Sequence, residues 1–393
     1  MLNLETLPAL QRAIADAGVD GWLLYDFRGI NPVVSGALGL RGMVSRRIFA
    51  YVPRAGAPTA ITHNIEQGPW RDWPAEWKKE QYSTWQQLEA AVKGLVGGKR
   101  VAMEFSPGDA VPYVDYVPGG VLEMVRAAGA TVICSGEIVT RFYAVWTTAQ
   151  MRSHERAAEF VGLSAREAFA MAGAKLAKGG PVMEHEVQQF LVDRFTRAGL
   201  EYDHEPIVAA GANAADPHYG PSERRPRALA KGELLLIDLW AREKDGIFAD
   251  QTWMAALGPP SPRAVDVWTA VRDARDAAIA RLTELVAGAQ PIRGGVIDDA
   301  ARAVITQRGF GPYFTHRTGH SIDAWQLHGA GPNIDNFETR EERVLVAGCG
   351  FSIEPGIYIP GEIGVRSEVN AFLDGDGKLT ITPREYQREL TVA

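Results

Sequence analysis

FTHRTGH, at residues 314–320, opens the stretch that decides the fold, and FSIEPGIY at 351–358 and GVRSE at 364–368 complete it. Imidazoles and carboxylates lie here on short apolar segments that are typical of strands. Burying a charged group is unfavourable unless a partner compensates it, and a metal ion is an effective partner for carboxylates. The stretch therefore predicts a polar, metal-binding site on buried strands.

Composition narrows the class of protein before any motif is used. A length of 393 residues favours two or three domains, and a hydrophobic content of 46 % is enough for a core in each. The net charge of −7 argues against a nucleic-acid partner, which would require a basic surface. No run of 18 apolar residues is present, so the sequence predicts neither a membrane-spanning helix nor a membrane partner.

The N-terminus and the cysteines predict where the protein works. Residues 1–5 lack the basic and apolar regions of a secretory signal. Cys134 and Cys349 each lie in an apolar segment, which is typical of buried free thiols in a reducing compartment. We therefore expect a cytoplasmic protein without disulfides.

Strands and helices alternate in the first part of the chain. Helices are expected at 4–17 and 121–128, and strands at 21–26, 47–52, 59–62, 101–105 and 131–134. This alternation predicts an N-terminal α/β domain over residues 1–146. Four tryptophans cluster in a charged segment of this domain, and they either cover a neighbouring surface or form a small local core: Trp70, Trp73, Trp77 and Trp85.

Residues 147–393 contain one arrangement twice. Helical patterns at 151–178 and 183–198 precede two strands at 233–240 and 247–253, with a further strand expected at 202–210. Helical patterns at 262–286 and 296–308 then precede the opening stretch. The repetition predicts an α+β domain with two similar halves that face each other, each of which supplies a pair of carboxylates.

The carboxylates of the two halves and one imidazole form a chemically coherent set. Asp238 and Asp250 flank the first pair of strands, and Glu354 and Glu368 occupy the corresponding places in the second half. His320 adds a nitrogen donor. This hard, oxygen-rich set suits Mn²⁺, Co²⁺, Fe²⁺ or Zn²⁺, and its negative charge is too high for a single ion, so a paired site is expected. Taken alone, each carboxylate is also compatible with an exposed strand edge or a salt bridge.

A paired metal site is a known device for hydrolysis. A water held between two ions loses its proton near neutral pH, and one ion polarises the carbonyl that is attacked. A neighbouring carboxylate then moves the proton toward the leaving amine. The remaining histidines of the motifs are candidates for stabilising the tetrahedral intermediate, although each of them is also compatible with a packing role: His218, His316 and His328.

With these motifs in place, residues 147–393 resemble the pita-bread metallopeptidases, which include Xaa-Pro dipeptidases (prolidases), Xaa-Pro aminopeptidases, methionine aminopeptidases and the metal-free creatinases. Residues 1–146 resemble, less specifically, the creatinase/prolidase N-terminal domain. The resemblance implies a pita-bread catalytic domain and two divalent ions per chain, Mn²⁺ foremost. It also implies a homodimer in which the N-terminal domain covers the substrate and forms the dimer contact.

The resemblance also carries roles over to individual residues. It implies that five residues bind the metal ions: Asp238, Asp250, His320, Glu354 and Glu368. His218, His316 and His328 match the substrate-side histidines of the family, and Glu354 matches its proton shuttle. Arg366 is a candidate for binding the free carboxylate of a dipeptide substrate, or alternatively for pairing with a metal-binding carboxylate.

Four departures from the family pattern concern the surroundings of these residues. Trp240 stands two residues after the first aspartate, where the family usually has a small residue, and Ser367 stands where an aliphatic residue is common. The hairpin that joins Asp238 to Asp250 is one residue longer than usual, as is the step from His320 to His328. The proposed ligands themselves are intact.

The sequence thus predicts a metallopeptidase that cleaves Xaa–Pro bonds, with proline-containing dipeptides as the preferred substrates. Cleavage of longer peptides, as by an Xaa-Pro aminopeptidase, is the alternative. A metal-free creatinase-like hydrolase and a non-catalytic binding protein are disfavoured, because both typically lose the ligands that are present here.

Overall fold

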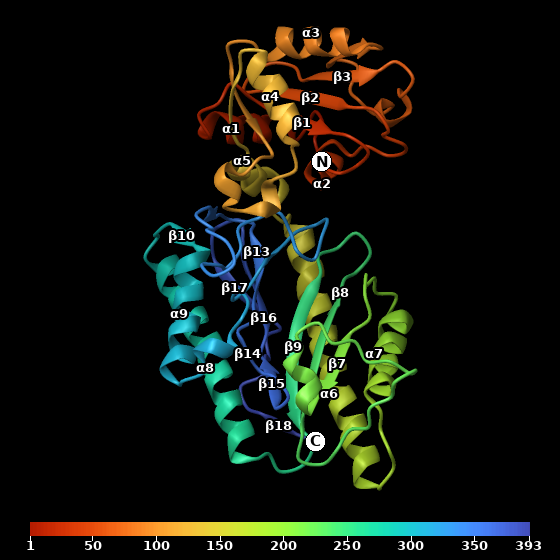
Figure 1. Ribbon diagram of the computed structural model, residues 1–393, viewed down its shortest axis with the longest axis vertical. Coiled ribbons are helices and arrows are strands. Elements are labelled where there is room, and N and C mark those ends of the chain that lie inside the picture. Colours follow the sequence, from red (N-terminus) through yellow and green to blue (C-terminus); the bar gives the residue numbers. More distant parts are fainter. The chain divides into compact units, whose positions relative to one another are not determined.

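The computed structural model describes residues 1–393 and divides into two compact units, Met1–Ala144 and Val145–Ala393 (Figure 1). The first unit ends two residues before the boundary expected after residue 146. Each unit has its own hydrophobic core and is described by itself.

A six-stranded mixed sheet forms the centre of the first unit, in the order β4-β3-β2-β1-β5-β6. Its strands are β1 (Gly21–Asp26), β2 (Ile48–Pro53), β3 (Thr59–His63), β4 (Lys78–Tyr82), β5 (Arg100–Met103) and β6 (Thr131–Cys134). The helices are α1 (Leu7–Asp16), α2 (Pro32–Leu38), α3 (Trp85–Val96), α4 (Gly119–Ala127) and α5 (Gly136–Ile138). Short helical turns lie at Gly68–Trp70, Pro107–Asp109, Pro112–Val114 and Val139–Tyr143. The predicted α/β class is confirmed, whereas α2, α3 and β4 were not foreseen.

The tryptophan cluster resolves into two parts. Trp70, Trp73 and Trp77 stack edge to face, with ring centroids 5.3 Å and 4.8 Å apart, and Trp70 and Trp77 are buried. These three rings form the local core that was one of the two alternatives. Trp85 begins α3 and remains exposed. Neither cysteine forms a disulfide, and only Cys349 is buried, because Cys134 lies on the edge strand β6.

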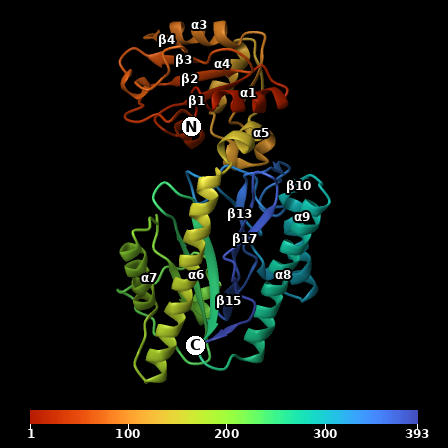
Figure 2. The same ribbon diagram turned by 180° about the vertical axis from the view of Figure 1, so that it is seen from behind.

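The second unit has two halves, and its first half is a sheet covered by two helices. The sheet contains β7 (Ile207–Ala210), β8 (Leu234–Ala241) and β9 (Ala249–Ala256), and β18 (Thr391–Val392) extends it beside β9. Helices α6 (Thr148–Ala177) and α7 (Glu184–Ala198) lie along its outer face (Figure 2). The strand expected at 202–210 begins only at Ile207, because exposed polar residues and Pro206 precede it.

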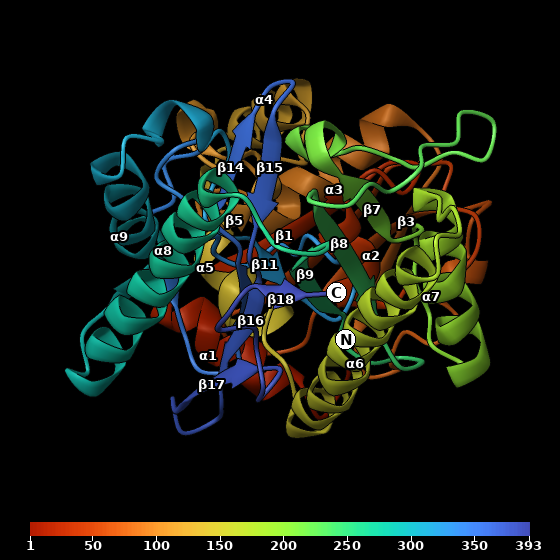
Figure 3. The ribbon, with the colours of Figure 1, turned by 90° about the horizontal axis from the view of Figure 1, so that it is seen from below.

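The second half repeats this plan with helices α8 (Pro262–Ala287) and α9 (Gly294–Gln307) outside. A sheet with the order β11-β13-β16-β17 is formed by Ser321–Ile322, Gly350–Ile353, Val369–Leu373 and Leu379–Thr382. Two ribbons accompany it, β14 (Gly356–Ile359) with β15 (Ile363–Arg366) and β10 (Ile292–Arg293) with β12 (Val344–Leu345). Short helical turns lie at Gly211–Ala215 (η5) and Gly311–Tyr313 (η6). Seen along the unit, the strands of both halves lie between the two helix pairs (Figure 3).

The side chains of β8 show how the sheet separates core from site. Successive residues of a strand point to opposite faces. Leu235, Ile237 and Leu239 pack into the core beneath α6 and α7, whereas Leu236 packs into the core of the second half. Asp238 is on the same face as Leu236 and therefore points toward the second half.

The helices of the structure include none with the length and apolar character that a membrane span requires.

His154 on α6 ties the first half to the C-terminal strands and should make the protein sensitive to acid. Its Nδ1 lies 2.8 Å from the carbonyl oxygen of Phe248, and its Nε2 lies 2.8 Å from Thr382 Oγ1. Burial lowers the pKa of His154 from 6.5 to about 4. The unfolded chain therefore binds a proton before the folded chain does, and stability is lost as the pH falls between these two values.

We expect the His154→Gln variant to lack the loss of stability at low pH that His154 causes. Between pH 6.5 and pH 4, the free energy of unfolding should fall less steeply in the variant than in the unmodified protein. The difference in slope should be about 1.4 kcal/mol per pH unit, which corresponds to one proton. Urea unfolding at several pH values measures the slope. His204→Gln is the matched control, because the His204 side chain is 80 % exposed. Equal slopes in His154→Gln and the unmodified protein would contradict the prediction.

Candidate metal centre

The β8–β9 hairpin aligns the polar side chains of the first half. Asp238 is the direct partner of Thr252, and Trp240 is the direct partner of Asp250. Directly opposed residues of an antiparallel pair share a face, so all four side chains point toward the second half. Thr252 Oγ1 lies 3.1 Å from Asp238 Oδ1. The spacing of two along each strand thus produces a row of oxygen donors.

The second half presents its donors from the ends of β13 and β15. Glu354 follows β13, and its backbone N–H donates to Thr318 O at 2.7 Å. Ser352 holds two donors in place, because its Oγ accepts from the His320 backbone N–H at 2.9 Å and donates to Glu354 Oε1 at 2.9 Å. These local bonds fix His320 and Glu354 relative to each other.

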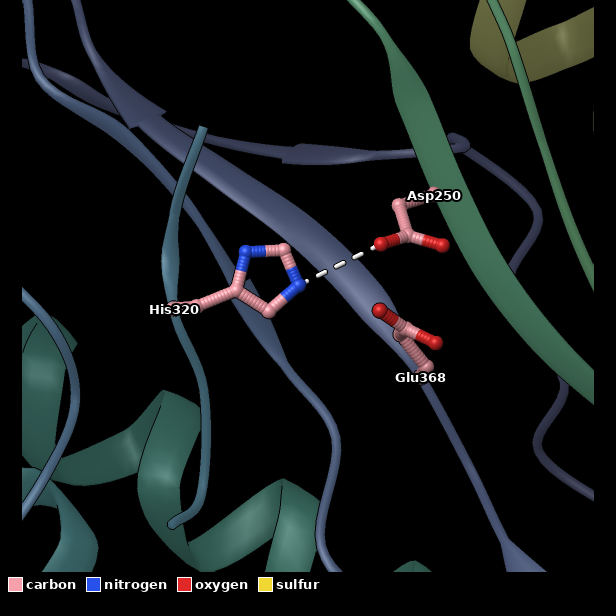
Figure 4. A group of neighbouring side chains, drawn as sticks. All are labelled: Asp250, His320 and Glu368. Atoms are coloured by element: carbon pink, nitrogen blue, oxygen red, sulfur yellow. Dashed lines mark ion pairs between the residues drawn. The ribbon is translucent and has the colours of Figure 1, made fainter. Parts of the chain in front are cut away.

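Glu368 joins the two halves directly. Its backbone N–H donates to Thr252 O at 3.2 Å, and its Oε2 lies 2.8 Å from Thr252 Oγ1. The structure thereby brings Asp250, His320 and Glu368 together, with one ligand atom of each within 4.8 Å of the others (Figure 4). His320 Nε2 is 3.3 Å from Asp250 Oδ2 and 3.4 Å from Glu354 Oε1.

The close approach of these buried carboxylates is electrostatically unfavourable without further positive charge. Removal from water raises the pKa of Asp238 to about 6 and raises the pKa of Asp250 and Glu368 well above the usual range. Repulsion from the neighbouring carboxylates acts in the same direction. Burial also lowers the pKa of His320, which keeps the imidazole in the neutral form that can act as a ligand.

The donors fit divalent metal ions. Glu368 Oε1 is buried and has no hydrogen-bond partner, although buried polar atoms are normally paired. A cation next to this oxygen would satisfy it and would relieve the repulsion among the carboxylates. Four carboxylates and one imidazole are also the donor types that Mn²⁺, Co²⁺, Zn²⁺ and Fe²⁺ accept.

Arg366 takes the second of the two roles that the sequence left open. Its guanidinium is buried and pairs with Asp238 Oδ2, and its Nε donates to Thr252 Oγ1 at 2.7 Å. Tyr358 Oη lies 3.4 Å from its Nη1. These bonds direct Arg366 to Asp238, a proposed metal-binding carboxylate.

The three substrate-side histidines occupy different surroundings. His316 Nε2 lies 2.9 Å from Tyr358 Oη, and the His328 ring lies 4.1 Å from that of His320. Both are therefore next to the donors. His218 is exposed, and its one hydrogen bond is from its backbone N–H to Asp216 Oδ1 at 3.0 Å. The structure does not bring its imidazole into contact with the group.

Sequence reasoning missed two supporting residues. Thr252 contacts Asp238, Glu368 and Arg366, and its place two residues after Asp250 on a strand is the signal that could have identified it. Arg275 of α8 is fully buried and donates to Ser367 Oγ at 2.6 Å. The unusual serine next to Glu368 is thus the partner of a buried arginine.

Close backbone packing places the loop of His218 against the second half. Turn η5 lies on β15, and a Cβ at Gly364 would come within 1.6 Å of Ala214 O. No side chain fits there unless one of the two backbones moves. Gly364 therefore sets the distance between η5 and the strand that leads to Arg366.

The fold and the donor set define a metal-dependent hydrolase, and comparison with known proteins identifies its family. The model of metallopeptidase family M24 matches residues 153–373. The chain belongs to this family and is a metallopeptidase of the pita-bread fold, as the sequence motifs predicted.

Individual relatives agree with this assignment. The Xaa-Pro dipeptidase of Lactobacillus helveticus is 38 % identical over 182 residues, which cover 45 % of this chain and 44 % of that protein. The probable dipeptidase PepE of Mycobacterium bovis is 27 % identical over 389 residues, 94 % of this chain and 91 % of the relative. The crystal structure of dipeptidase PepE from Mycobacterium ulcerans matches with a TM-score of 0.75 and 24 % identity, covering 99 % and 97 % of the two chains. A prolidase from Thermococcus sibiricus matches with a TM-score of 0.67 and 23 % identity over the full length of both chains.

The Gly364→Ala variant should test the packing of η5 on β15. We expect it to lower the free energy of unfolding by about 1–3 kcal/mol, because the added methyl group forces the two backbones apart. Urea unfolding measures the change. Gly375→Ala is the control, since a Cβ at Gly375 meets no atom within 4 Å. Equal stability of the two variants would show that the close approach is unimportant.

Proposed function

We propose that this metallopeptidase hydrolyses the bond between an N-terminal residue and proline, with two divalent metal ions per chain and Xaa-Pro dipeptides as its main substrates. The observation that carries the proposal is the convergence of Asp250, His320 and Glu368, with Glu354 beside His320 and with Glu368 Oε1 buried and unpartnered. The identity to the Xaa-Pro dipeptidase of Lactobacillus helveticus supports the choice of substrate. Action on longer Xaa-Pro peptides is the second candidate.

Five residues would hold the two ions: Asp238, Asp250, His320, Glu354 and Glu368. When bound, the ions supply an activated water and polarise the scissile carbonyl. Manganese is the metal that we propose, on the oxygen-rich character of the donors. Arg366 acts as a positioning residue in this scheme, because it holds Asp238 and compensates part of the buried negative charge.

The chain's own groups would move the proton and hold the substrate. Glu354 accepts the proton of the attacking water and passes it to the leaving proline nitrogen, since it is next to the other donors and is only partly enclosed. His316 and His328 lie next to the same donors and stabilise the negative charge that develops on the carbonyl oxygen. His218 requires a shift of its exposed loop to take part.

The remaining parts of the proposal concern the whole protein. Residues 1–146 would cover the substrate and form a homodimer contact, and residues 147–393 would carry the chemistry. Exposed Trp85 of the first unit is available for such a contact. We place the enzyme in the cytoplasm, in line with two cysteines that form no disulfide.

Metal analysis with a substrate panel tests the proposed function. We expect about two ions per chain after loading with Mn²⁺, and a rise in thermal stability because the ions bind only the folded state. Ala-Pro should be cleaved faster than Ala-Pro-Ala, whereas Ala-Ala should resist cleavage. Metal removal by a chelator should abolish activity and lower the melting temperature. Absence of bound metal, or bound metal without Xaa-Pro cleavage, would refute the proposal.

The Asp250→Ala variant tests the donor set itself. We expect kcat/KM to fall by at least about a thousandfold and metal content to fall as well, because Asp250 is next to both His320 and Glu368. The metal-free fold should persist, as judged by circular dichroism. Asp245→Asn is the matched control, since Asp245 is an exposed carboxylate in the turn of the same hairpin. An active Asp250→Ala enzyme would exclude Asp250 as a metal ligand.

A further inference from the structure

Trp240 occupies the position next to the proposed metal centre on β8. It is the direct partner of Asp250 on β9, and it is two residues from Asp238 on the same strand. Its indole therefore projects from the face that carries the donors. The ring is partly exposed, so it is available to a bound molecule.

Asp203 fixes the orientation of this ring. The indole Nε1–H donates to Asp203 Oδ1 at 2.5 Å. The Asp203 side chain is 48 % exposed, its one ion-pair neighbour is the His204 imidazole at 3.5 Å, and no lysine or arginine pairs with it. Asp203 thus leaves an uncompensated negative charge beside an aromatic face.

This carboxylate is bonded to the ring that lies directly opposite Asp250 on the β8–β9 hairpin. Arg242, which follows the end of β8, pairs with Glu201 at 3.2 Å rather than with Asp203. Its guanidinium lies over the ring of Phe248, 4.6 Å from the centroid.

Apolar side chains complete the surroundings of the ring. Trp240, Ala324 and Leu327 pack against one small hydrophobic cluster that includes Phe248. Leu327 immediately precedes His328, whose ring contacts that of His320. We call Trp240, Ala324 and Leu327 the apolar wall; Leu327 is the neighbour of His328 in the chain, and Trp240 is bonded to Asp203.

We propose that Asp203 and Trp240 form a subsite for a cationic side chain, so that the enzyme prefers lysine or arginine as the residue before proline. This inference rests on the proposed function. The wall would hold the methylene stem, while the indole face and the carboxylate attract the charged end. When the scissile bond lies at the buried donors, an extended side chain is the part of an N-terminal residue that can reach exposed Asp203.

Two dipeptides that differ only in charge test the subsite. Lysyl-proline and norleucyl-proline have the same linear side chain, except that norleucine lacks the ammonium group. We expect kcat/KM of the Mn²⁺-loaded enzyme to be about tenfold higher for lysyl-proline, given the strengths of an exposed cation–π contact and an exposed ion pair. In Asp203→Asn the ratio of the two kcat/KM values should fall to about three, which is the share of the indole face, because cleavage of lysyl-proline slows.

Two further variants separate the contributions. Trp240→Leu removes the aromatic face and should lower the ratio about threefold, provided that circular dichroism shows a native fold. Asp203→Asn keeps an acceptor for the indole N–H and alters only an exposed side chain, so it tests the subsite even if Trp240→Leu does not fold. Glu205→Gln is the control, because it removes the same charge from the same loop, and the ratio should stay near that of the unmodified enzyme.

The outcomes for the subsite and for the proposed function are distinct. Cleavage of alanyl-proline reports on the proposed function alone. If alanyl-proline is cleaved but lysyl-proline and norleucyl-proline are cleaved equally well, the subsite is refuted and the proposed function stands. A ratio that is unaltered in Asp203→Asn refutes it in the same way. If no Xaa-Pro dipeptide is cleaved, both inferences fall.

Discussion

The mutual repulsion of four carboxylates, buried where two hairpins meet, is the constraint on which the catalytic unit depends. The Arg366 guanidinium pairs with Asp238 and lies 4.0 Å from Glu368 Oε2. Thr252 connects Asp238 to Glu368 through its hydroxyl group, and the backbone bond from Glu368 N–H to Thr252 O connects the strands themselves. Positive charge from bound protons or cations would stabilise the arrangement, so metal binding would be thermodynamically linked to folding.

Local motifs sufficed to predict much of this architecture. The pattern LLLID ending at Asp238 and the pattern IEPGIY around Glu354 each combine an apolar strand with a carboxylate, and strand periodicity fixes the face on which each carboxylate lies. The helices of the second unit were predicted to within a few residues at most ends, because their apolar periodicity is sustained over several turns. Five candidate ligands followed from these segments together with the family resemblance.

The supporting contacts could not be predicted, because they join segments far apart in the chain. Thr252 and Glu368 are 116 residues apart, and Arg275 and Ser367 are 92 residues apart. Nothing in the neighbourhood of Arg366 decides between a substrate carboxylate and Asp238 until the hairpins have been assembled. Trp240 was recognisable as unusual, but its meaning depends on Asp203, which lies in irregular chain before β7.

The strict pairing of β8 with β9 limits how this enzyme can diverge during evolution. A slip of one residue in the pairing would turn Asp238 and Trp240 away from the centre and present Ile237 and Leu239 instead. Insertions are therefore tolerated only where the connection between the strands can absorb them. The turn at Asp245 is such a place, because its left-handed backbone, with φ of 59°, bends the chain beyond the paired residues. Length variation among homologues should accumulate in this turn, whereas the pairing register of the two strands should stay the same.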